Sequence, residues 1–235
     1  MERLAEQAAA FGLALTPPQL AQFARYEELL LAWNEQLNLT AIRDPAGIRL
    51  RHFLDSLTCA TVTGDLSGQR LIDVGSGAGF PGLPLKLLYP SLHLVLVESV
   101  GKKARFLKAV VADLALTGVA VLAERAELLG QQPAHREQYD WVVARSVAEL
   151  RILVEYLLPL CRVGGQVLAQ KGTSAAAEAA QAAPAIATLG GNTPHLTPVQ
   201  LPGRDQPHYL LTIPKIHPTP AGYPRRPGLP AKRPL

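Results

Sequence analysis

The chain has 235 residues, of which 48% are hydrophobic and 18% charged, and its net charge is +4 with an isoelectric point near 9.2. This composition supplies a sizeable core and excludes a globally disordered chain. The distant pair Cys59 and Cys161 excludes a disulfide scaffold and a cysteine-rich zinc module. Because neither a secretory signal nor an apolar run long enough to span a membrane is visible, we expect a cytoplasmic protein with two free thiols.

Residues 1–65 carry no strand pattern and are predicted to form a helical extension. Thr16 precedes two prolines, as a residue that caps the start of a helix does, and Asp44 precedes Pro45 in the same way. The apolar residues between them recur at intervals of three, four and seven, which is the spacing of one helix face. They are Leu20, Phe23, Leu30, Trp33 and Leu37.

From residue 66 onward, short apolar runs alternate with helical stretches, which predicts βαβ units and a parallel sheet. The predicted strands are 70–74, 93–97, 119–123, 141–144, 166–170, 194–201 and 208–213, and the predicted helices between the early strands are 83–89, 102–117 and 149–158. Only a short turn at 202–205 divides the last two strands, so we expect them to pair as an antiparallel hairpin. Residues 66–213 are the predicted central domain.

A glycine-rich turn from Gly75 to Gly82 follows the first predicted strand and precedes a helix. Glycines let the backbone turn tightly and approach a ligand, and the first N–H groups of the helix are free to bind it. The spacing of Gly77, Gly79 and Gly82 matches the dinucleotide fingerprint, which keeps a nicotinamide-dependent oxidoreductase open.

Two carboxylates favour a different ligand. Asp73 lies two residues before Gly75, where it would repel a pyrophosphate but suits the cationic amino-acid end of S-adenosylmethionine; a loop-capping role is the alternative. Glu98 closes the second strand, where it can accept both ribose hydroxyls of either ligand class or be merely a solvated strand end. The pattern from Asp73 to Gly79 resembles motif I of the class I Rossmann-like methyltransferases, which also end their sheet with an antiparallel strand.

The residues after the fourth strand, Arg145 to Glu149, are where this fold holds its methyl acceptor. They contain neither an Asn/Asp-Pro-Pro-aromatic segment for an exocyclic amine nor a cysteine for covalent attack on a pyrimidine. Guanine N7 needs no proton removed, which fits a site without an evident general base. We expect Arg145 to face the cofactor or a phosphate, with a salt bridge at the strand end as the alternative.

Several segments together resemble one family, the bacterial RsmG (GidB) guanine-N7 methyltransferases of small-subunit ribosomal RNA. They are Asn-Leu-Thr-Ala-Ile at 38–42, Arg-His-Phe-Leu-Asp-Ser-Leu at 51–57, Asp-Val-Gly-Ser-Gly-Ala-Gly-Phe-Pro-Gly at 73–82, Glu-Ser-Val-Gly-Lys-Lys at 98–103, Arg-Ala-Glu at 125–127, Gly-Gly at 164–165 ahead of Lys-Gly at 171–172, and Tyr-Pro-Arg-Arg-Pro-Gly at 223–228. One departure is Val-Ala-Glu at 147–149, where we would expect a proline-containing run.

The resemblance implies S-adenosyl-L-methionine as cofactor and one guanosine in the decoding-region hairpin of 16S rRNA as methyl acceptor. With the glycine loop included, the expected cofactor-binding residues are Asp73, Gly75, Ser76, Gly77, Phe80, Glu98, Ser99, Val100, the main chain at Ala126 and Glu127, and Arg145. For Phe80, a place in the core is the alternative. The implied fold is a mostly parallel seven-stranded sheet with a C-terminal hairpin and an N-terminal helical extension.

Candidate acceptor-side residues are His52, Asp55, Asn38 and Arg145. His52 and Asp55 lie one helical turn apart and could instead be a surface pair, and Asn38 could simply cap the preceding helix. Lys102 and Lys103 begin a helix, where basic groups oppose the dipole, so we expect them to contact RNA phosphates unless they form only a solvated face. The six histidines lack metal-ligand spacing, and no metal is expected.

The last 22 residues, 214–235, form a predicted arm with seven prolines, five basic residues and no acidic one, whereas the rest of the chain has a net charge of −1. The basic residues are Lys215, Arg225, Arg226, Lys232 and Arg233. Such an arm contains neither a helix nor a central strand and is either mobile or laid on the body. We expect Arg225, Arg226, Lys232 and Arg233 to bind RNA, the alternative being a solubilising terminus.

The expected partner is 16S rRNA in the small ribosomal subunit or in an assembly intermediate of it, bound by a monomer that contacts no membrane. A non-catalytic ribosome-assembly protein that binds RNA remains a further reading, although the intact glycine loop argues against it.

Overall fold

The computed structural model describes residues 1–235 and contains one seven-stranded sheet with the strand order β3-β2-β1-β4-β5-β7-β6. The strands are β1 (Arg70–Val74), β2 (His93–Val97), β3 (Val119–Leu122), β4 (Tyr139–Arg145), β5 (Cys161–Lys171), β6 (His195–Val199) and β7 (His208–Pro214). The pairs β1–β4, β4–β5 and β2–β3 are parallel, and β7 is antiparallel to both β5 and β6. The predicted mixed sheet with a C-terminal hairpin is confirmed.

The chain divides into two compact units, which are described separately. The first comprises residues 1–69 and 76–123, and the second comprises residues 70–75 and 124–235. The predicted division at residues 65 and 213 has other bounds than these units, and it stays a prediction.

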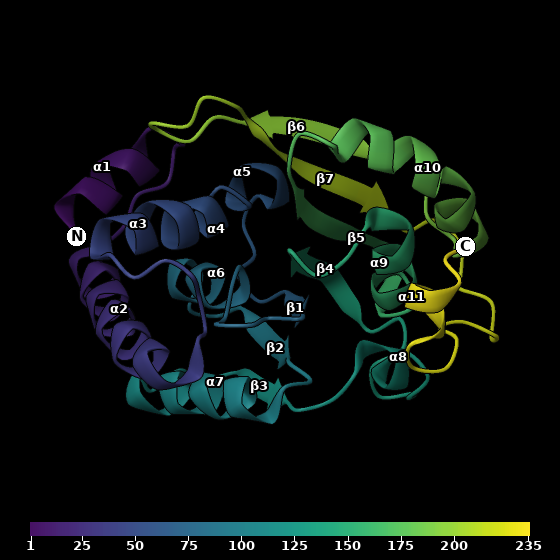
Figure 1. Ribbon diagram of the computed structural model, residues 1–235, viewed down its shortest axis with the longest axis horizontal. Helices are drawn as coiled ribbons and strands as arrows, with labels where there is room; N and C mark the ends of the chain where they lie inside the picture. Colours follow the sequence, from purple (N-terminus) through teal and green to yellow (C-terminus); the bar gives the residue numbers. More distant parts are fainter. The chain divides into compact units, whose positions relative to one another are not determined.

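The first unit begins with α1 (Glu2–Ala9) and α2 (Pro17–Leu37), drawn in purple in Figure 1. Thr16 caps α2 as predicted: its hydroxyl accepts from the Gln19 N–H at 3.5 Å, and the Gln19 side chain accepts from the Thr16 N–H at 2.8 Å. One face of α2 is buried, with Phe23, Tyr26 and Leu30 fully covered. The periodicity of apolar residues therefore located this helix correctly.

A second helical run follows Asp44, whose carboxylate accepts from the Gly47 N–H at 2.6 Å. It consists of α3 (Pro45–Ile48), the π-helical η1 (Arg49–Leu54) and α4 (Asp55–Leu57), and α5 (Ala60–Thr63) comes next. Residues 1–65 contain no strand, so the predicted helical extension is confirmed in its secondary structure. The π-helical turn was not predicted, because the apolar pattern does not distinguish it from an α-helix.

The rest of the first unit is α6 (Gly82–Leu88), β2, α7 (Gly101–Asp113) and β3. Helix α2 packs against α6 and α7. The Gln19 amide donates to the carbonyl of Leu87 at 2.9 Å, and the Arg25 guanidinium binds Asp113 at 2.8 Å. The N-terminal helices are thereby attached to the helices that flank β2 and β3.

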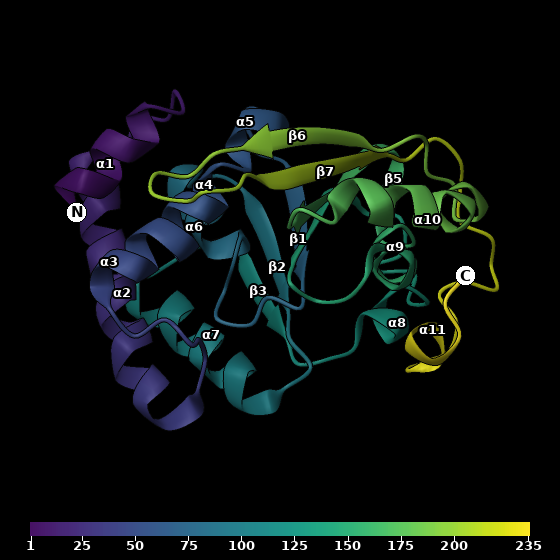
Figure 2. The same ribbon diagram turned by 45° about the horizontal axis from the view of Figure 1, so that its top comes forward.

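The second unit contains β1, β4, β5, β7 and β6 with α8 (Ala126–Leu129), α9 (Leu150–Leu157) and α10 (Ala175–Thr188), and Figure 2 shows the long β6–β7 hairpin. Strand β5 begins five residues before the predicted start, at Cys161. Gly164 and Gly165 lie in an irregular stretch of the strand where the register to β4 shifts, and Gly164 has a φ of +80°. The predicted start of the strand was therefore too late, because glycines also occur inside strands at bulges.

The C-terminal arm belongs to the second unit and contains α11 (Leu229–Lys232), drawn in yellow in Figure 1. The prediction that the arm contains no helix is wrong for this single turn, which Gly228 precedes with a φ of +79° and in which Pro230 occupies an early position. Proline is compatible with the first turn of a helix because the N–H it lacks has no intrahelical partner there.

Candidate functional site

The glycine loop of the first unit is fixed by backbone hydrogen bonds. The Ser76 N–H donates to the carbonyl of Val97 at 3.0 Å, and the Ser76 carbonyl accepts from Gly79 at 2.7 Å and from Phe80 at 3.0 Å. Gly79 has a φ of +99°, and a Cβ there would meet the Leu83 side chain. This position therefore requires glycine both for its conformation and for lack of space.

Glu98 holds the glycine loop from the end of β2. One carboxylate oxygen accepts from the Gly77 N–H at 3.0 Å, and the other accepts from the Val100 N–H at 2.7 Å. Its residue is only 6% exposed, so it is not a solvated strand end. An ionised carboxylate offers about four lone-pair sites, of which these bonds use two. Glu98 can therefore accept further hydroxyl donors, while the neighbouring Ser99 and Val100 are exposed.

Phe80 lies in the core of the first unit. Its ring is 4% exposed and stacks on the rings of His52, with centroids 4.6 Å apart, and of Tyr26, at 5.6 Å. The Tyr26 hydroxyl donates to the carbonyl of Ala78 in the glycine loop. The core role that the sequence left open for Phe80 is thus observed, and a cofactor contact stays a prediction.

The acceptor-side candidates of the first unit lie around a polar turn that follows α2. The His52 Nε2 and Thr40 Oγ1 atoms are 2.7 Å apart, and Asn34 binds both the N–H and the carbonyl of Thr40, at 2.9 and 3.0 Å. Asp55 opens α4 and is 8% exposed, so it is not part of a surface pair.

Asn38 occupies the left-handed cap of α2 with a φ of 49°, which is the capping role considered from the sequence. Its side-chain oxygen accepts from Arg43 at 3.4 Å. Asn34 and Thr40 were not singled out by sequence reasoning. The only signal was the Asn-Leu-Thr motif, of which Thr40 is a member and to which Asn34 lies close in the sequence.

In the second unit, the ends of β1 and β4 lie side by side in parallel register, with Asp73 opposite Val143. Asp73 is fully buried. Gly75 follows with a φ of +72°, and a Cβ there would lie 2.7 Å from the Val147 side chain. The start of the glycine turn and the loop after β4 therefore pack together without room for a side chain at Gly75.

The loop after β4 is held in a defined conformation. Arg145 pairs with Gln170 at the end of β5, and Ser146 adopts a φ of 56°, which is rare for a residue other than glycine. The Lys171 ammonium donates to the carbonyl of Ala148 at 2.6 Å and to Glu178 at 2.8 Å.

Glu178 on α10, which binds Lys171, also accepts from the Leu150 N–H at 2.9 Å, directly after the loop that follows β4. Burial by itself raises the pKa of the Glu178 carboxyl, but hydrogen bonds from Lys171 and Ser174 outweigh it and place the pKa below its ordinary value. The carboxylate form is therefore stabilised. Sequence reasoning named Lys171 only as part of a motif and did not identify this role.

Ala126 and Glu127 form the start of α8. Both are buried, and the Glu127 side chain accepts from the Gly228 N–H of the arm at 3.0 Å. The cofactor contact that the resemblance implies for the main chain of these two residues stays a prediction.

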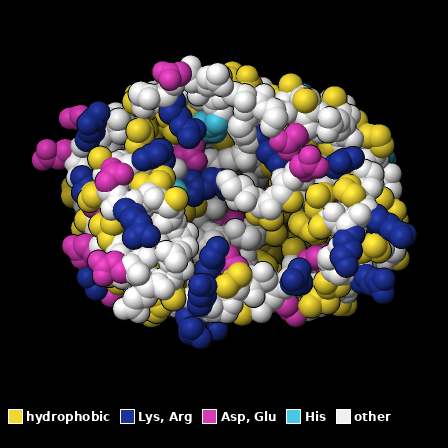
Figure 3. All heavy atoms as spheres, in the orientation of Figure 1, with side chains coloured by type: hydrophobic (Ala, Val, Ile, Leu, Met, Phe, Trp, Pro, Cys, Tyr) yellow, Lys and Arg dark blue, Asp and Glu magenta, His cyan; other side chains and the backbone are white.

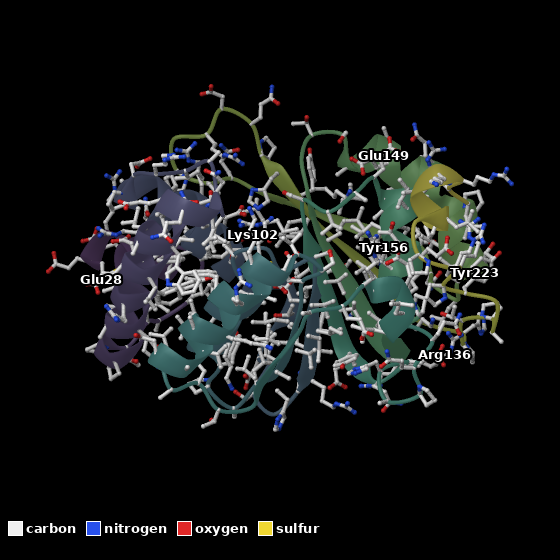
Figure 4. The ribbon with its side chains drawn as sticks, turned by 60° about the horizontal axis from the view of Figure 1, so that its bottom comes forward. Glu28, Lys102, Arg136, Glu149, Tyr156 and Tyr223 are labelled. Atoms are coloured by element: carbon white, nitrogen blue, oxygen red, sulfur yellow. The ribbon has the colours of Figure 1, made fainter.

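The predicted RNA-binding residues differ in exposure. Lys102 is exposed at the start of α7, where Figure 4 labels it, and Lys103 is partly exposed. Arg226, Lys232 and Arg233 are exposed as well. Figure 3 shows blue side chains gathered at the edge where Figure 1 draws α11.

Arg225 differs from the other arm residues, because its guanidinium binds the buried carboxylate of Glu155 at 2.6 Å. Its guanidinium therefore forms an ion pair within the second unit, and an RNA contact at Arg225 stays a prediction.

Two further findings concern a cysteine and metal-ligating side chains. Burial raises the pKa of the Cys161 thiol to about 12, so a thiolate nucleophile does not form there near neutral pH. No group of three or more His, Cys, Asp or Glu side chains could hold a metal ion.

None of the helices is long and apolar enough to cross a membrane.

Comparisons with known proteins agree with this geometry. The family described as rRNA small subunit methyltransferase G matches residues 19–205. A protein of Roseiflexus castenholzii named ribosomal RNA small subunit methyltransferase G is 56% identical over the full length of both chains. A protein of Chloroflexus aggregans with the same name is 51% identical over 99% of this chain and 97% of its own.

Solved structures resemble the fold at low identity. A SAM-dependent O-methyltransferase of Thermotoga maritima superposes with a TM-score of 0.52 at 15% identity, over 81% of this chain and 71% of its own. A variant of the 16S rRNA (adenine(1408)-N(1))-methyltransferase of Catenulisporales acidiphilia gives 0.53 at 15% identity, over 66% and 88%. The predicted Rossmann-like methyltransferase fold is thereby confirmed.

Proposed function

Because the chain belongs to the rRNA small subunit methyltransferase G family, we propose that it transfers a methyl group from S-adenosyl-L-methionine to N7 of one guanosine in the decoding-region hairpin of 16S rRNA. The observation that carries the proposal is the full-length similarity to proteins of that name together with a glycine loop anchored by Glu98. The family membership and the loop point to the same cofactor.

The residues present fit this cofactor. The remaining lone pairs of Glu98 are available to ribose hydroxyls, and the exposed apolar Val100 beside it suits the face of a nucleobase. Asp73 provides a buried carboxylate at the end of β1, which suits a cation and disfavours a pyrophosphate. The remaining contacts are assigned to Gly75, Ser76, Gly77, Phe80, Ser99, the main chain at Ala126 and Glu127, and Arg145. This charge pattern argues against the nicotinamide alternative.

When bound, the cofactor supplies an electrophilic methyl group on a sulfonium. The protein's own task is to position the acceptor and to accommodate the positive charge that develops on the purine. Guanine N7 carries an in-plane lone pair, so no general base is needed. The ordered loop from Arg145 to Glu149, held by Lys171, presents the acceptor side of the second unit. His52, Asp55 and Asn38 provide candidate acceptor contacts from the first unit.

RNA binding is assigned to the exposed basic residues Lys102, Arg226, Lys232 and Arg233 and to the partly exposed Lys103. The substrate is the small ribosomal subunit or an assembly intermediate of it, and the enzyme acts as a monomer in the cytoplasm, where that substrate is found. Residues 1–65 serve as the helical extension that shapes the RNA-binding surface, residues 66–213 as the methyltransferase domain, and residues 214–235 as the arm.

The experiment uses radiolabelled S-adenosylmethionine with small-subunit particles that lack the modification, followed by digestion of the RNA to nucleosides. Label in 7-methylguanosine supports the proposal. Cofactor binding without transfer to any RNA would instead support a non-catalytic assembly protein. Binding of NAD(H) in place of S-adenosylmethionine, measured by calorimetry, would support the oxidoreductase.

A further inference from the structure

We infer that the C-terminal arm is a clasp that holds the segment Ala126–Glu127 in place, so that Arg225 and its partner Glu155 are positioning residues for the cofactor. The inference rests on the proposed function, since the main chain at Ala126 and Glu127 is a proposed cofactor contact. It gives the arm a task within the protein that precedes any contact with RNA.

Helix α8, which begins with these two residues, cannot fix its own position. It has four residues, and a helix of one turn is not stable without tertiary contacts because its nucleation cost exceeds the gain from its few hydrogen bonds. Its position therefore depends on what packs against it. Within the second unit, those neighbours are α9 and the arm.

The arm contacts α8 at Glu127 and at the two residues that follow the helix. The Gly228 N–H donates to the Glu127 carboxylate at 3.0 Å, and the Gln131 amide donates to the carbonyl of Pro224 at 2.8 Å. A Cβ on Gly130 would lie 2.7 Å from the Pro224 ring, so the end of α8 and the arm touch without space for a side chain. These contacts join residues about a hundred positions apart in the sequence into one packed layer.

Arg136 ties the same two segments together. Its guanidinium donates to the carbonyl of Gly130 at 2.8 Å, to that of Tyr223 at 2.6 Å and to that of Thr219 at 2.7 Å. Figure 4 labels Arg136 and Tyr223 close to the yellow ribbon of the arm. It also donates to the carbonyl of Pro220 at 3.1 Å, so one side chain bridges Gly130, which caps the end of α8, and three carbonyls of the arm.

The strongest attachment of the arm is the ion pair on α9. Arg225 donates through its backbone N–H and its guanidinium to the Glu155 carboxylate, at distances from 2.6 to 3.1 Å. The Glu155 side chain is fully buried, whereas that of Arg225 is 21% exposed. Tyr156, which follows Glu155, is close enough to the carboxylates of Glu127 and Glu155 that burial and their charges raise the pKa of its phenol.

The charge of the arm is consistent with this task. An arm made only to contact phosphates would leave its cations in water, yet Arg225 binds a protein carboxylate and the Lys215 ammonium is buried among the carbonyls of Leu158 and Leu189. Two of its five basic side chains are thus used inside the second unit.

The test compares Arg225→Ala with its exposed neighbour, Arg226→Ala, in the full chain. The clasp predicts that Arg225→Ala raises the Kd and the KM for S-adenosylmethionine at least about tenfold, equivalent to about 1.4 kcal/mol, while kcat at saturating cofactor stays within about twofold. Arg226→Ala leaves the cofactor Kd unchanged. A folded Arg225→Ala protein with the cofactor Kd of the unaltered chain overturns the clasp.

A second pair of variants is expected to change cofactor binding by a smaller factor. Gly228 has a φ of +79° with open space around it, whereas Gly222 has open space and no positive φ. Gly228→Ala strains the backbone whose N–H binds Glu127 and is expected to weaken cofactor binding a few-fold, and Gly222→Ala is expected to have no effect. Equal cofactor affinities for the two variants contradict the inference.

If Arg225→Ala does not fold, hydrogen exchange on the unaltered protein tests the clasp instead. Because coupling is reciprocal, S-adenosylmethionine must slow exchange in the arm, at residues 221–233, as well as in α8. Slower exchange in α8 with an unchanged arm overturns the clasp. If the unaltered protein binds no S-adenosylmethionine at all, the proposed function fails and the clasp with it.

Discussion

The start of α7 and the C-terminal arm are both basic in the sequence, and they differ in where that charge lies in the fold. On α7, Lys102, Arg105 and Lys108 are exposed. In the arm, Arg225 binds Glu155 and Lys215 is buried, so only Arg226, Lys232 and Arg233 remain on the surface. A cluster of basic residues in the sequence therefore predicts positive charge, but it does not show which side chains are free to bind RNA. Buried carboxylates and carbonyls from distant parts of the chain can bind the same side chains.

The largest expected effect separates Arg225 from Arg226. Arg225→Ala leaves the fully buried Glu155 carboxylate without its partner and is expected to lower the free energy of unfolding by about 3 kcal/mol. Arg226→Ala is expected to change it by less than about 0.5 kcal/mol, because that side chain is exposed. Urea denaturation of both variants measures the difference. Similar midpoints for the two would show that Arg225 is as dispensable as a surface residue.

The exposed basic residues of the arm should contribute most to the salt dependence of the protein's RNA affinity. Replacing Arg226, Lys232 and Arg233 together by Gln is expected to reduce the slope of log affinity against log salt concentration by about 2, because each lost phosphate contact removes about 0.7 for a single strand. Filter binding or fluorescence anisotropy with the 16S hairpin over a range of salt measures the slope. An unchanged slope would remove the arm from the RNA-binding surface.

The corresponding change on α7 should be smaller. Replacing Lys102 and Lys103 by Gln is expected to reduce the same slope by about 1.4. Lys108→Gln provides the matched control on the same helix, because it is an exposed lysine outside the predicted RNA-binding pair. If the control variant lowers the slope as much as one member of the pair, the contact surface extends along α7.

The smallest expected effect concerns Lys215. Burial lowers its pKa to about 8 from 10.5, so between these values the unfolded chain binds more protons than the folded one. The free energy of unfolding should therefore rise with pH, by about 1 kcal/mol between pH 8 and pH 9 from this group. Denaturation at the two pH values, compared between the unaltered chain and Lys215→Met, measures the contribution of Lys215 to this rise. Lys232→Met, which changes an exposed lysine, is the control. An equal rise in Lys215→Met would assign the pH dependence to other groups.

Local patterns were sufficient for much of the fold. Thr16 and Gln19 lie three residues apart and form the predicted cap, and the glycine turn with Glu98 at the next strand end follows from short segments. The hairpin of β6 and β7 followed from a short turn. Such features depend on neighbours within a few residues, which the sequence displays directly.

Long-range partners could not be predicted in the same way. Arg225 and Glu155 are 70 residues apart, and Gly228 and Glu127 are 101 apart. Nothing in either local segment indicates its partner, because the pairing depends on how α8, α9 and the arm pack. For the same reason the sequence did not distinguish whether Phe80 belongs to the core, which its stacking on His52 decides.

The most direct test of the central claim is the position of the methyl group. Unmodified small-subunit particles are incubated with the protein and labelled S-adenosylmethionine, and the RNA is digested and mapped. We expect label in 7-methylguanosine at a single site in the decoding-region hairpin. Label in any other nucleoside, or no label although the cofactor binds, would contradict it.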